Sequence, residues 1–388
     1  MEIVEKGKYS PELEPDEPAW IFTGYYFNLY FLRFDLFHED WNDYEAFDQP
    51  PLAKYIVGGA LFLRGYTIDS LDPKRFWNSI PADKLPTYYD LVKHRIPNPT
   101  IVIPSTRSII AIFALLSLPL IYISVRILYG VLPALISTTL IISNPIFNYY
   151  SIRILADPIL LFFFALFTLL CALYLKSQKN IYIVLTFIVS SLAFLTKLNG
   201  ILLVFVLITI FLIKNKFSIS KQDCKFLITG LIAFLLISVL LNPVFLNTGI
   251  KAIWKMVEVR LSAFRVLQET FKDAALLSVS ERFVAATKLM FFRYSLFYQL
   301  IKVPVELIMF LLGIYYIFKR KDLFLITIFA FLVVIPISIL PFNFPRYCYW
   351  IFPFTHIIAG VSLNLLKEIL SRKDIRFLKV HNKFQHNP

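Results

Sequence analysis

Charged residues and cysteines are both scarce in this sequence. Asp, Glu, Lys and Arg make up 17% of its 388 residues, whereas a soluble domain carries about 25%. The three cysteines, Cys171, Cys224 and Cys348, lie far apart and form no Cys/His cluster, so neither a disulfide framework nor a zinc site is predicted. The segment from Met1 to Glu17 lacks an apolar run and therefore does not have the pattern of a secretion signal. These absences exclude a soluble globular protein and a disulfide-linked secreted domain.

Apolar and aromatic residues dominate instead. Hydrophobic residues account for 58% of the chain, with 39 Phe, 21 Tyr and 5 Trp, and the mean hydropathy is +0.67. Rings in such numbers are typical of surfaces that face lipid or lie at headgroup depth. The net charge of +13 is explained by cations in cytoplasmic loops and near anionic lipid headgroups, so no nucleic-acid partner is expected. The composition predicts an all-α integral membrane protein whose partners include membrane lipid.

The beginning of the chain has only short apolar pieces. Residues 1–104 contain no run of about 20 apolar residues, the length that a spanning helix needs. Trp20–Phe34 and Leu52–Leu63 are predicted to be helices that lie in the membrane interface. Asp69–Pro104, rich in Pro, Asp and Lys, is predicted to be an irregular loop. The predicted organisation is an outer N-terminal segment, a multi-span domain and a basic cytoplasmic tail, over residues 1–104, 105–366 and 367–388.

About nine spanning helices are predicted after this segment. They cover residues 105–125, 131–147, 158–175, 181–196, 199–213, 226–245, 303–318, 323–340 and 350–366. Lys and Arg gather in alternate short connections, and this bias places those connections in the cytoplasm. The connection 246–302 is then a long outer loop, and apolar residues at helical spacing from Ile250 to Phe264 predict an amphipathic helix on the membrane surface.

This topology brings acids and cations to one outer face. The residues concerned are Asp16, Glu17, Asp48, Arg153, Asp157, Lys197 and Arg346. An ionisable group at a helix end in a membrane is costly unless it is paired or functional. Carboxylates can take a proton from an acceptor hydroxyl or hold a divalent cation, and Lys and Arg can bind a phosphate leaving group. The set therefore suits a reaction on a lipid-borne phosphate.

Each of these residues also has a simpler explanation. Arg153, Lys197 and Arg346 fit snorkelling anchors at the interface. Asp157 precedes a proline at a helix start, where N-capping explains it as well as catalysis does. The pair Asp16–Glu17 stands beside two other glutamates and fits a solvated acidic patch. The residue pattern alone leaves both explanations open.

Four motifs resemble those of protein O-mannosyltransferases and the related lipid A aminoarabinose transferases. They are Asp16-Glu17 followed by an aromatic stretch and Asp48-Gln49-Pro50-Pro51-Leu52-Ala53-Lys54, then Ser151–Phe163, Leu192–Gly200 and Pro345-Arg346-Tyr347. The resemblance implies a GT-C fold and an inverting transfer of a sugar from a polyprenyl or dolichyl phosphate to a hydroxyl of a protein, lipid or glycan. Mannose or a similar hexose is the expected sugar, and the expected location is the non-cytoplasmic face of the plasma membrane.

The resemblance also implies roles for individual residues. Asp16 is expected to be the catalytic base, with Glu17 and Asp157 in supporting catalytic roles. The expected substrate-binding residues are Asp48, Gln49, Lys54, Arg153, Lys197 and Arg346. No metal ligand set is assigned and no cofactor is identified, and a divalent cation is the one candidate left open.

The chain departs from the family pattern at three points. Gln49 stands where mannosyltransferases usually have His and aminoarabinose transferases have Lys, and Arg153 lies one place later than the family Arg. The family has a spanning helix before the acid pair, so we expect the DNA upstream of Met1 to encode an in-frame apolar run. A transporter or lipid-linked glycan flippase, and a catalytically inactive relative, are the alternative interpretations. Charges at one face and the lack of an internal repeat favour the enzyme.

Overall fold

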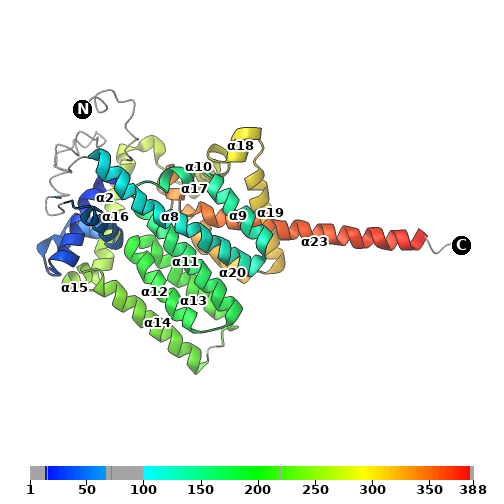
Figure 1. The fold of residues 1–388 in the computed structure, drawn as a ribbon, viewed down its shortest axis with the longest axis horizontal. Coiled ribbons are helices and arrows are strands. Elements are labelled where there is room, and N and C mark those ends of the chain that lie inside the picture. The colour runs from blue at the N-terminus through cyan, green and yellow to red at the C-terminus, as the bar shows by residue number, and fades with distance from the viewer. Residues whose placement is uncertain (1–13, 15, 67–70, 72–98, 219, 385–388) are drawn as a thin grey trace.

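The computed structural model describes residues 14, 16–66, 71, 99–218 and 220–384. Over these ranges the chain is helical (Figure 1), with one isolated β-bridge between Ala275 and Phe342. The predicted all-α class is confirmed. Most of the predicted loop Asp69–Pro104, and Glu12 in the acidic tail, lie outside the described residues.

Both short apolar pieces near the N-terminus are helical, as predicted. The first consists of α2 (Glu17–Thr23), α3 (Tyr25–Phe27) and a π-helical turn, η1 (Asn28–Leu32), and the second is α5 (Leu52–Leu63). The two helices cross where glycine faces glycine: a Cβ on Gly58 would lie 2.3 Å from the carbonyl oxygen of Gly24. No other residue fits there without moving the backbones apart. This close crossing fixes the start of α2, which carries the acid pair.

The predicted spans all correspond to helices. In chain order these are α8 (Pro99–Tyr129), α9 (Val131–Ser143) with α10 (Pro145–Tyr150), α11 (Ala156–Ser177), α12 (Ile181–Thr196), α13 (Leu202–Lys214), α14 (Lys221–Leu240), α19 (Val305–Arg320), the run α20 (Leu323–Ile328), η7 (Phe329–Val334) and α21 (Ile335–Ser338), and α23 (Phe352–Phe384). Three of them, α8, α11 and α14, are long and apolar enough to cross a membrane by length and composition, and further apolar helices are shorter. The number of nine spans stays a prediction.

Helix ends differ from the prediction for local reasons. α8 begins at Pro99, inside the stretch predicted to be loop, because proline is favoured in a first helical turn, where its missing N–H has no intrahelical partner. α14 begins five residues earlier than predicted because Ser220 and Asp223 form a capping box. α23 continues through the predicted basic tail to Phe384 and projects beyond the rest of the molecule (Figure 1).

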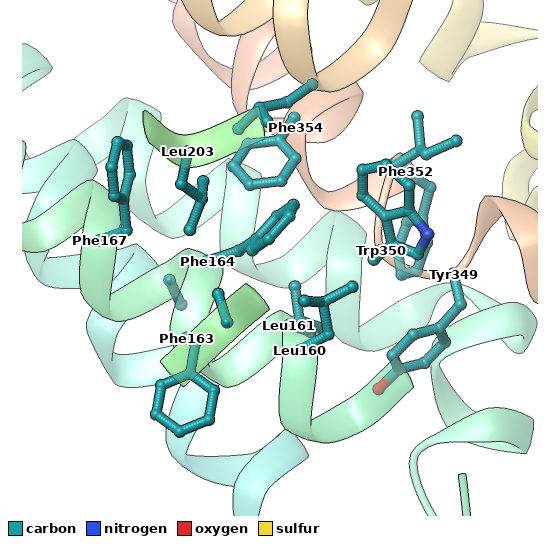
Figure 2. Close-up of a cluster of buried hydrophobic side chains, with 14 of the residues drawn as sticks. Leu160, Leu161, Phe163, Phe164, Phe167, Leu203, Tyr349, Trp350, Phe352 and Phe354 are labelled. Carbon is teal, nitrogen blue, oxygen red and sulfur yellow. The ribbon is translucent and has the colours of Figure 1, made fainter. Parts of the chain in front are cut away.

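Helix α11 lies at the centre of the helical body. Of its most apolar stretch, 67% is buried, against 17% for α14, most of whose surface is not covered by other described residues. Figure 2 shows Phe164 of α11 among the side chains that precede and begin α23. Its ring meets that of Trp350 edge-on, with centroids 5.4 Å apart, and lies 6.1 Å from that of Phe354. This aromatic contact anchors the chain on either side of Trp350 to the core.

The long outer connection is also helical. It contains α15 (Val244–Thr248), α16 (Lys251–Thr270), α17 (Val279–Lys288), η6 (Leu289–Arg293) and α18 (Leu296–Ile301). α16 is the amphipathic helix that the periodicity predicted. Its Trp254 is 74% exposed, as suits a side chain that meets a membrane surface. The opposite side of α16 packs against α4 (Tyr44–Asp48), which ends at the Asp48 motif.

Candidate active site

The predicted acids and cations meet at one end of the helical body. Asp16 and Glu17 begin α2, Asp157 lies in the first turn of α11, Lys197 connects α12 to η4 (Leu198–Ile201), and Arg346 lies in the short helix α22 (Pro345–Cys348). These residues are far apart in the sequence, yet ion pairs connect them in space. The convergence inferred from alternating topology is therefore present in the structure.

Glu17 is a completely buried carboxylate with several donors around it. Arg107 of α8 donates from Nε to Oε1 over 2.7 Å and also pairs with Oε2. The backbone N–H groups of Ile154 and Glu14 donate to the two oxygens over 2.9 and 3.0 Å. Arg153 lies 4.0 Å from the same carboxylate. Glu17 therefore joins three segments, and its saturated hydrogen bonding suits a positioning role rather than proton transfer.

Asp16 has the opposite environment. Its side chain is 45% exposed, and Arg346 Nη1 contacts its Oδ2. The same Arg346 nitrogen lies 3.4 Å from Glu14 Oε1. Asp16 is thus an accessible carboxylate held by one guanidinium, next to the buried Glu17 in the chain. Of the two acids in the pair, only Asp16 is placed to meet a substrate.

Glu14 completes this acidic group. It is 8% exposed, and burial raises the pKa of its carboxyl to about 7, while Arg346 opposes the shift. Its Oε2 accepts from the backbone N–H of Asp16 over 2.9 Å. Glu14 is one of the two other glutamates of the acidic tail, for which a solvated patch was one of the two open explanations, and nothing in its local sequence indicates burial.

Asp157 and Lys197 form a buried ion pair. Lys197 Nζ lies 2.7 Å from Asp157 Oδ1, and Lys197 is 8% exposed and Asp157 3% exposed. Burial lowers the pKa of Lys197, with the Asp157 carboxylate opposing the shift. Asp157 therefore compensates a lysine, a role different from the helix N-cap that its position before Pro158 also suggested.

The Asp48 motif lies at the side of this group. Asp48 Oδ1 accepts from Arg260 Nη1 of α16 over 2.7 Å, and both side chains are partly exposed. Lys54 is buried, and its ammonium donates to the backbone carbonyls of Gln49, over 2.6 Å, and Glu45. Burial lowers the pKa of Lys54 to about 8. Lys54 thus fixes the turn between α4 and α5, while the buried Gln49 Oε1 has no hydrogen-bond partner among the described residues.

Several partners in the site were missed from the sequence. Arg107 falls within a predicted span, and Arg260 lies in the long outer loop where cations have no predictive value for orientation. A further buried pair, His356 Nε2 and Glu306 Oε2, is 4.0 Å apart between α23 and α19. Among the residues that the structure describes, no group of three or more His, Cys, Asp or Glu side chains could hold a metal ion.

Known proteins resemble this chain in part of its sequence and in its fold. A family model described as dolichyl-phosphate-mannose-protein mannosyltransferase matches residues 102–242. ArnT from Cupriavidus metallidurans in the apo state aligns with a TM-score of 0.50 and 15% identity over 91% of this chain. The same protein bound to undecaprenyl phosphate aligns with a TM-score of 0.52, also at 15% identity and 91% coverage.

The chain spans 55–56% of the length of these two ArnT chains. No curated protein matched its sequence. The segment matched by the family model includes Asp157 and Lys197 and does not include Asp16. The chain therefore has an ArnT-like GT-C fold.

Proposed function

We propose that this protein is a membrane glycosyltransferase. It moves a sugar, mannose or a similar hexose, from a polyprenyl phosphate to a hydroxyl of a protein, lipid or glycan at the non-cytoplasmic face. The observation that carries the proposal is the contact between the accessible Asp16 and Arg346, set on the buried groups Glu17–Arg107 and Asp157–Lys197. A base and phosphate-binding cations are thereby adjacent. The undecaprenyl phosphate bound to ArnT, a protein of the same fold, supports a polyprenyl phosphate as the donor.

Asp16 is the proposed general base. The acceptor oxygen forms a bond to the anomeric carbon as its proton moves to the Asp16 carboxylate. The bond between that carbon and the phosphate oxygen breaks, and its electron pair leaves with the polyprenyl phosphate. Attack opposite the leaving group inverts the anomeric configuration. A positioned base of this kind accelerates reaction by about 10²–10⁴-fold.

Arg346 and Lys197 are the proposed phosphate-binding cations. In the structure Arg346 already pairs with Asp16 and Glu14, so a donor phosphate must compete with these carboxylates for the guanidinium. When Arg346 turns to the phosphate, Asp16 loses a partner and becomes available to the acceptor hydroxyl. Donor binding would thereby prepare the base. Glu17 accepts hydrogen bonds from Arg107 and from two backbone N–H groups, and so keeps the start of α2 in place during this change.

The remaining predicted residues have supporting positions. Asp48, with Arg260, presents a partly exposed polar pair beside the main group, suited to the acceptor or the sugar. Arg153 stacks on Tyr149, with its guanidinium 4.3 Å from the ring centre, and contacts Glu17. Gln49 offers a buried amide oxygen, and Lys54 holds the turn on which Gln49 stands.

Transfer of labelled sugar by the purified protein tests the proposal. The assay compares polyprenyl phosphates carrying mannose, glucose and aminoarabinose, with peptide and lipid acceptors. Asp16→Asn should lower turnover about 10²–10⁴-fold with donor affinity little changed. Glu39→Gln is a matched control, because Glu39 is an exposed acid of the same N-terminal segment. Equal activity of the two variants would contradict the assignment of Asp16.

The same experiment separates the enzyme from a transporter. Reconstituted in vesicles, a flippase would move the labelled donor across the bilayer and leave its glycosidic bond to phosphate intact. An inactive relative would bind the donor without either result. Translocation without transfer, or binding alone, would therefore overturn the proposed function.

A further inference from the structure

A cationic cavity lies between α8 and α11, at the end opposite the candidate active site. It is open to the surface, has a volume of about 400 Å³ and is lined by Ile123, Arg126, Ile127, Leu173 and Lys176. Arg126 lies in the last turn of α8, and Lys176 lies in the last turn of α11. Two exposed cations therefore lie beside three aliphatic side chains, on two helices that pack against each other.

The depth of this cavity corresponds to a second membrane surface. Arg107 of α8 contacts Glu17 in the active site, and Arg126 follows it along the same helix. At 1.5 Å per residue these two positions are separated by about 28 Å, which is close to the hydrocarbon thickness of a bilayer. Asp157 and Lys176 are separated equally along α11. The cavity thus lies at headgroup depth in the opposite leaflet.

The cations of the cavity have no acidic partner among the described residues. No ion pair or hydrogen bond joins Arg126 or Lys176 to a described side chain, whereas other cations at this end have partners. Arg320 pairs with Glu368, and Lys214 lies over the ring of Tyr174 at 3.5 Å from its centre. A site with two uncompensated positive charges attracts an anion, and its aliphatic lining favours one that carries hydrocarbon chains.

We propose that this cavity binds an anionic phospholipid of the leaflet opposite the active site. Arg126 and Lys176 hold the lipid phosphate and headgroup, and an acyl chain follows Ile123, Ile127 and Leu173. The guanidinium can donate two parallel hydrogen bonds to phosphate oxygens, and the lysine adds a point charge. Because the site is remote from Asp16, this inference is independent of the proposed transfer reaction.

Lipid titration of the purified protein, followed by native mass spectrometry, tests the site. The probes are phosphatidylglycerol, phosphatidylcholine with the same acyl chains, and glycerol 3-phosphate. Two cations near a lipid surface contribute about 1 kcal/mol each, so R126Q/K176Q should weaken phosphatidylglycerol binding by about 30-fold. Phosphatidylcholine and glycerol 3-phosphate should bind weakly to both the wild-type protein and this variant.

K221Q/K225Q is the matched control. Lys221 and Lys225 are exposed at the start of α14, at the same end as Lys176: the neighbouring Asn180 hydrogen-bonds to Asp223 over 3.1 Å. The control removes the same charge but touches no cavity residue, so phosphatidylglycerol affinity should change by less than about 3-fold. An equal loss in both double variants would show diffuse attraction to charge. Tight binding of phosphatidylcholine would also overturn the proposal, because it would indicate an apolar groove without charge selection. Tight binding of glycerol 3-phosphate would overturn it as well, because it would indicate a simple anion site.

Discussion

Glu17→Gln and Asp16→Asn together test whether the two adjacent acids have different roles. Glu17 is buried against Arg107, whereas the adjacent Asp16 is about half exposed beside Arg346. Both variants keep the shape of the side chain and remove one negative charge. We expect Glu17→Gln to lower the free energy of unfolding strongly, and Asp16→Asn to lower turnover with little effect on unfolding.

The magnitudes follow from burial. Removing one partner of a buried ion pair leaves an uncompensated charge and typically costs 3–5 kcal/mol, so about this loss is expected for Glu17→Gln. An ion pair with an exposed member is worth about 0–1 kcal/mol, which bounds the effect of Asp16→Asn. Loss of a general base lowers turnover by about 10²–10⁴-fold. Glu17→Gln should therefore cause the larger loss of stability, and Asp16→Asn should cause a large loss of turnover with little loss of stability.

Denaturant unfolding of the purified protein in detergent, followed by tryptophan fluorescence, measures the free energy of unfolding. E17Q/R107Q should recover part of the stability lost in E17Q, because the charge of Arg107 is then no longer left unpaired in the core. Arg320→Gln is the control for loss of an exposed pair, since the Arg320 side chain is 53% exposed. A loss below about 1 kcal/mol for Glu17→Gln would refute the structural role assigned to this carboxylate.

Three further outcomes follow from the site and the topology. Lys197→Met should weaken donor binding about tenfold or more, because a charge-assisted hydrogen bond is worth about 1.5–3 kcal/mol. Adding Asp157→Asn should restore stability without restoring donor affinity, and ligand titration and unfolding of the same samples measure the two quantities. Unchanged donor affinity of Lys197→Met would show that Lys197 is a snorkelling anchor. The pKa of Glu14 is raised from 4.5 to about 7 in the folded chain, so its contribution to stability is complete below pH 4.5 and is lost as the pH rises through about 7. Unfolding midpoints should therefore fall over that range in the wild type but not in Glu14→Gln, and parallel curves would contradict this. In intact cells the exposed native Cys224 should resist an impermeant thiol reagent, while a cysteine placed at the exposed Asn343 should react; the reverse labelling would place the candidate site in the cytoplasm.

Helices were predictable because their signals are local. Continuous apolar stretches predicted α8 to α14, and the helical spacing after Ile250 predicted α16. The errors concern helix ends, where a single cap decides: Ser220 and Asp223 start α14 earlier than hydropathy alone indicates. Alternating loop charges also predicted correctly that the starts of α2 and α11 and the end of α12 share one end of the molecule.

Side-chain partners were not predictable in the same way. Glu17 and Arg107 are separated by 90 residues, and Asp48 and Arg260 by 212 residues, so no spacing rule connects them. Burial within a polar segment was equally hidden. The sequence around Glu14 gives no sign that it is buried, because the covering atoms come from segments far along the chain. The role of each acid could therefore be assigned only from the tertiary structure.

The arrangement around Arg346 connects these observations. One guanidinium serves two carboxylates, and Asp16 lies 330 residues away from it in sequence. If both acids were ionised, a negatively charged donor would have to displace two competitors from Arg346. Burial raises the pKa of Glu14 to about 7 and so favours its protonated form, which competes less with a phosphate for Arg346. On the proposed mechanism, phosphate binding then releases the residue that must take the acceptor proton. Protonation of the buried Glu14 would thus leave Arg346 freer to bind the donor phosphate and to release Asp16.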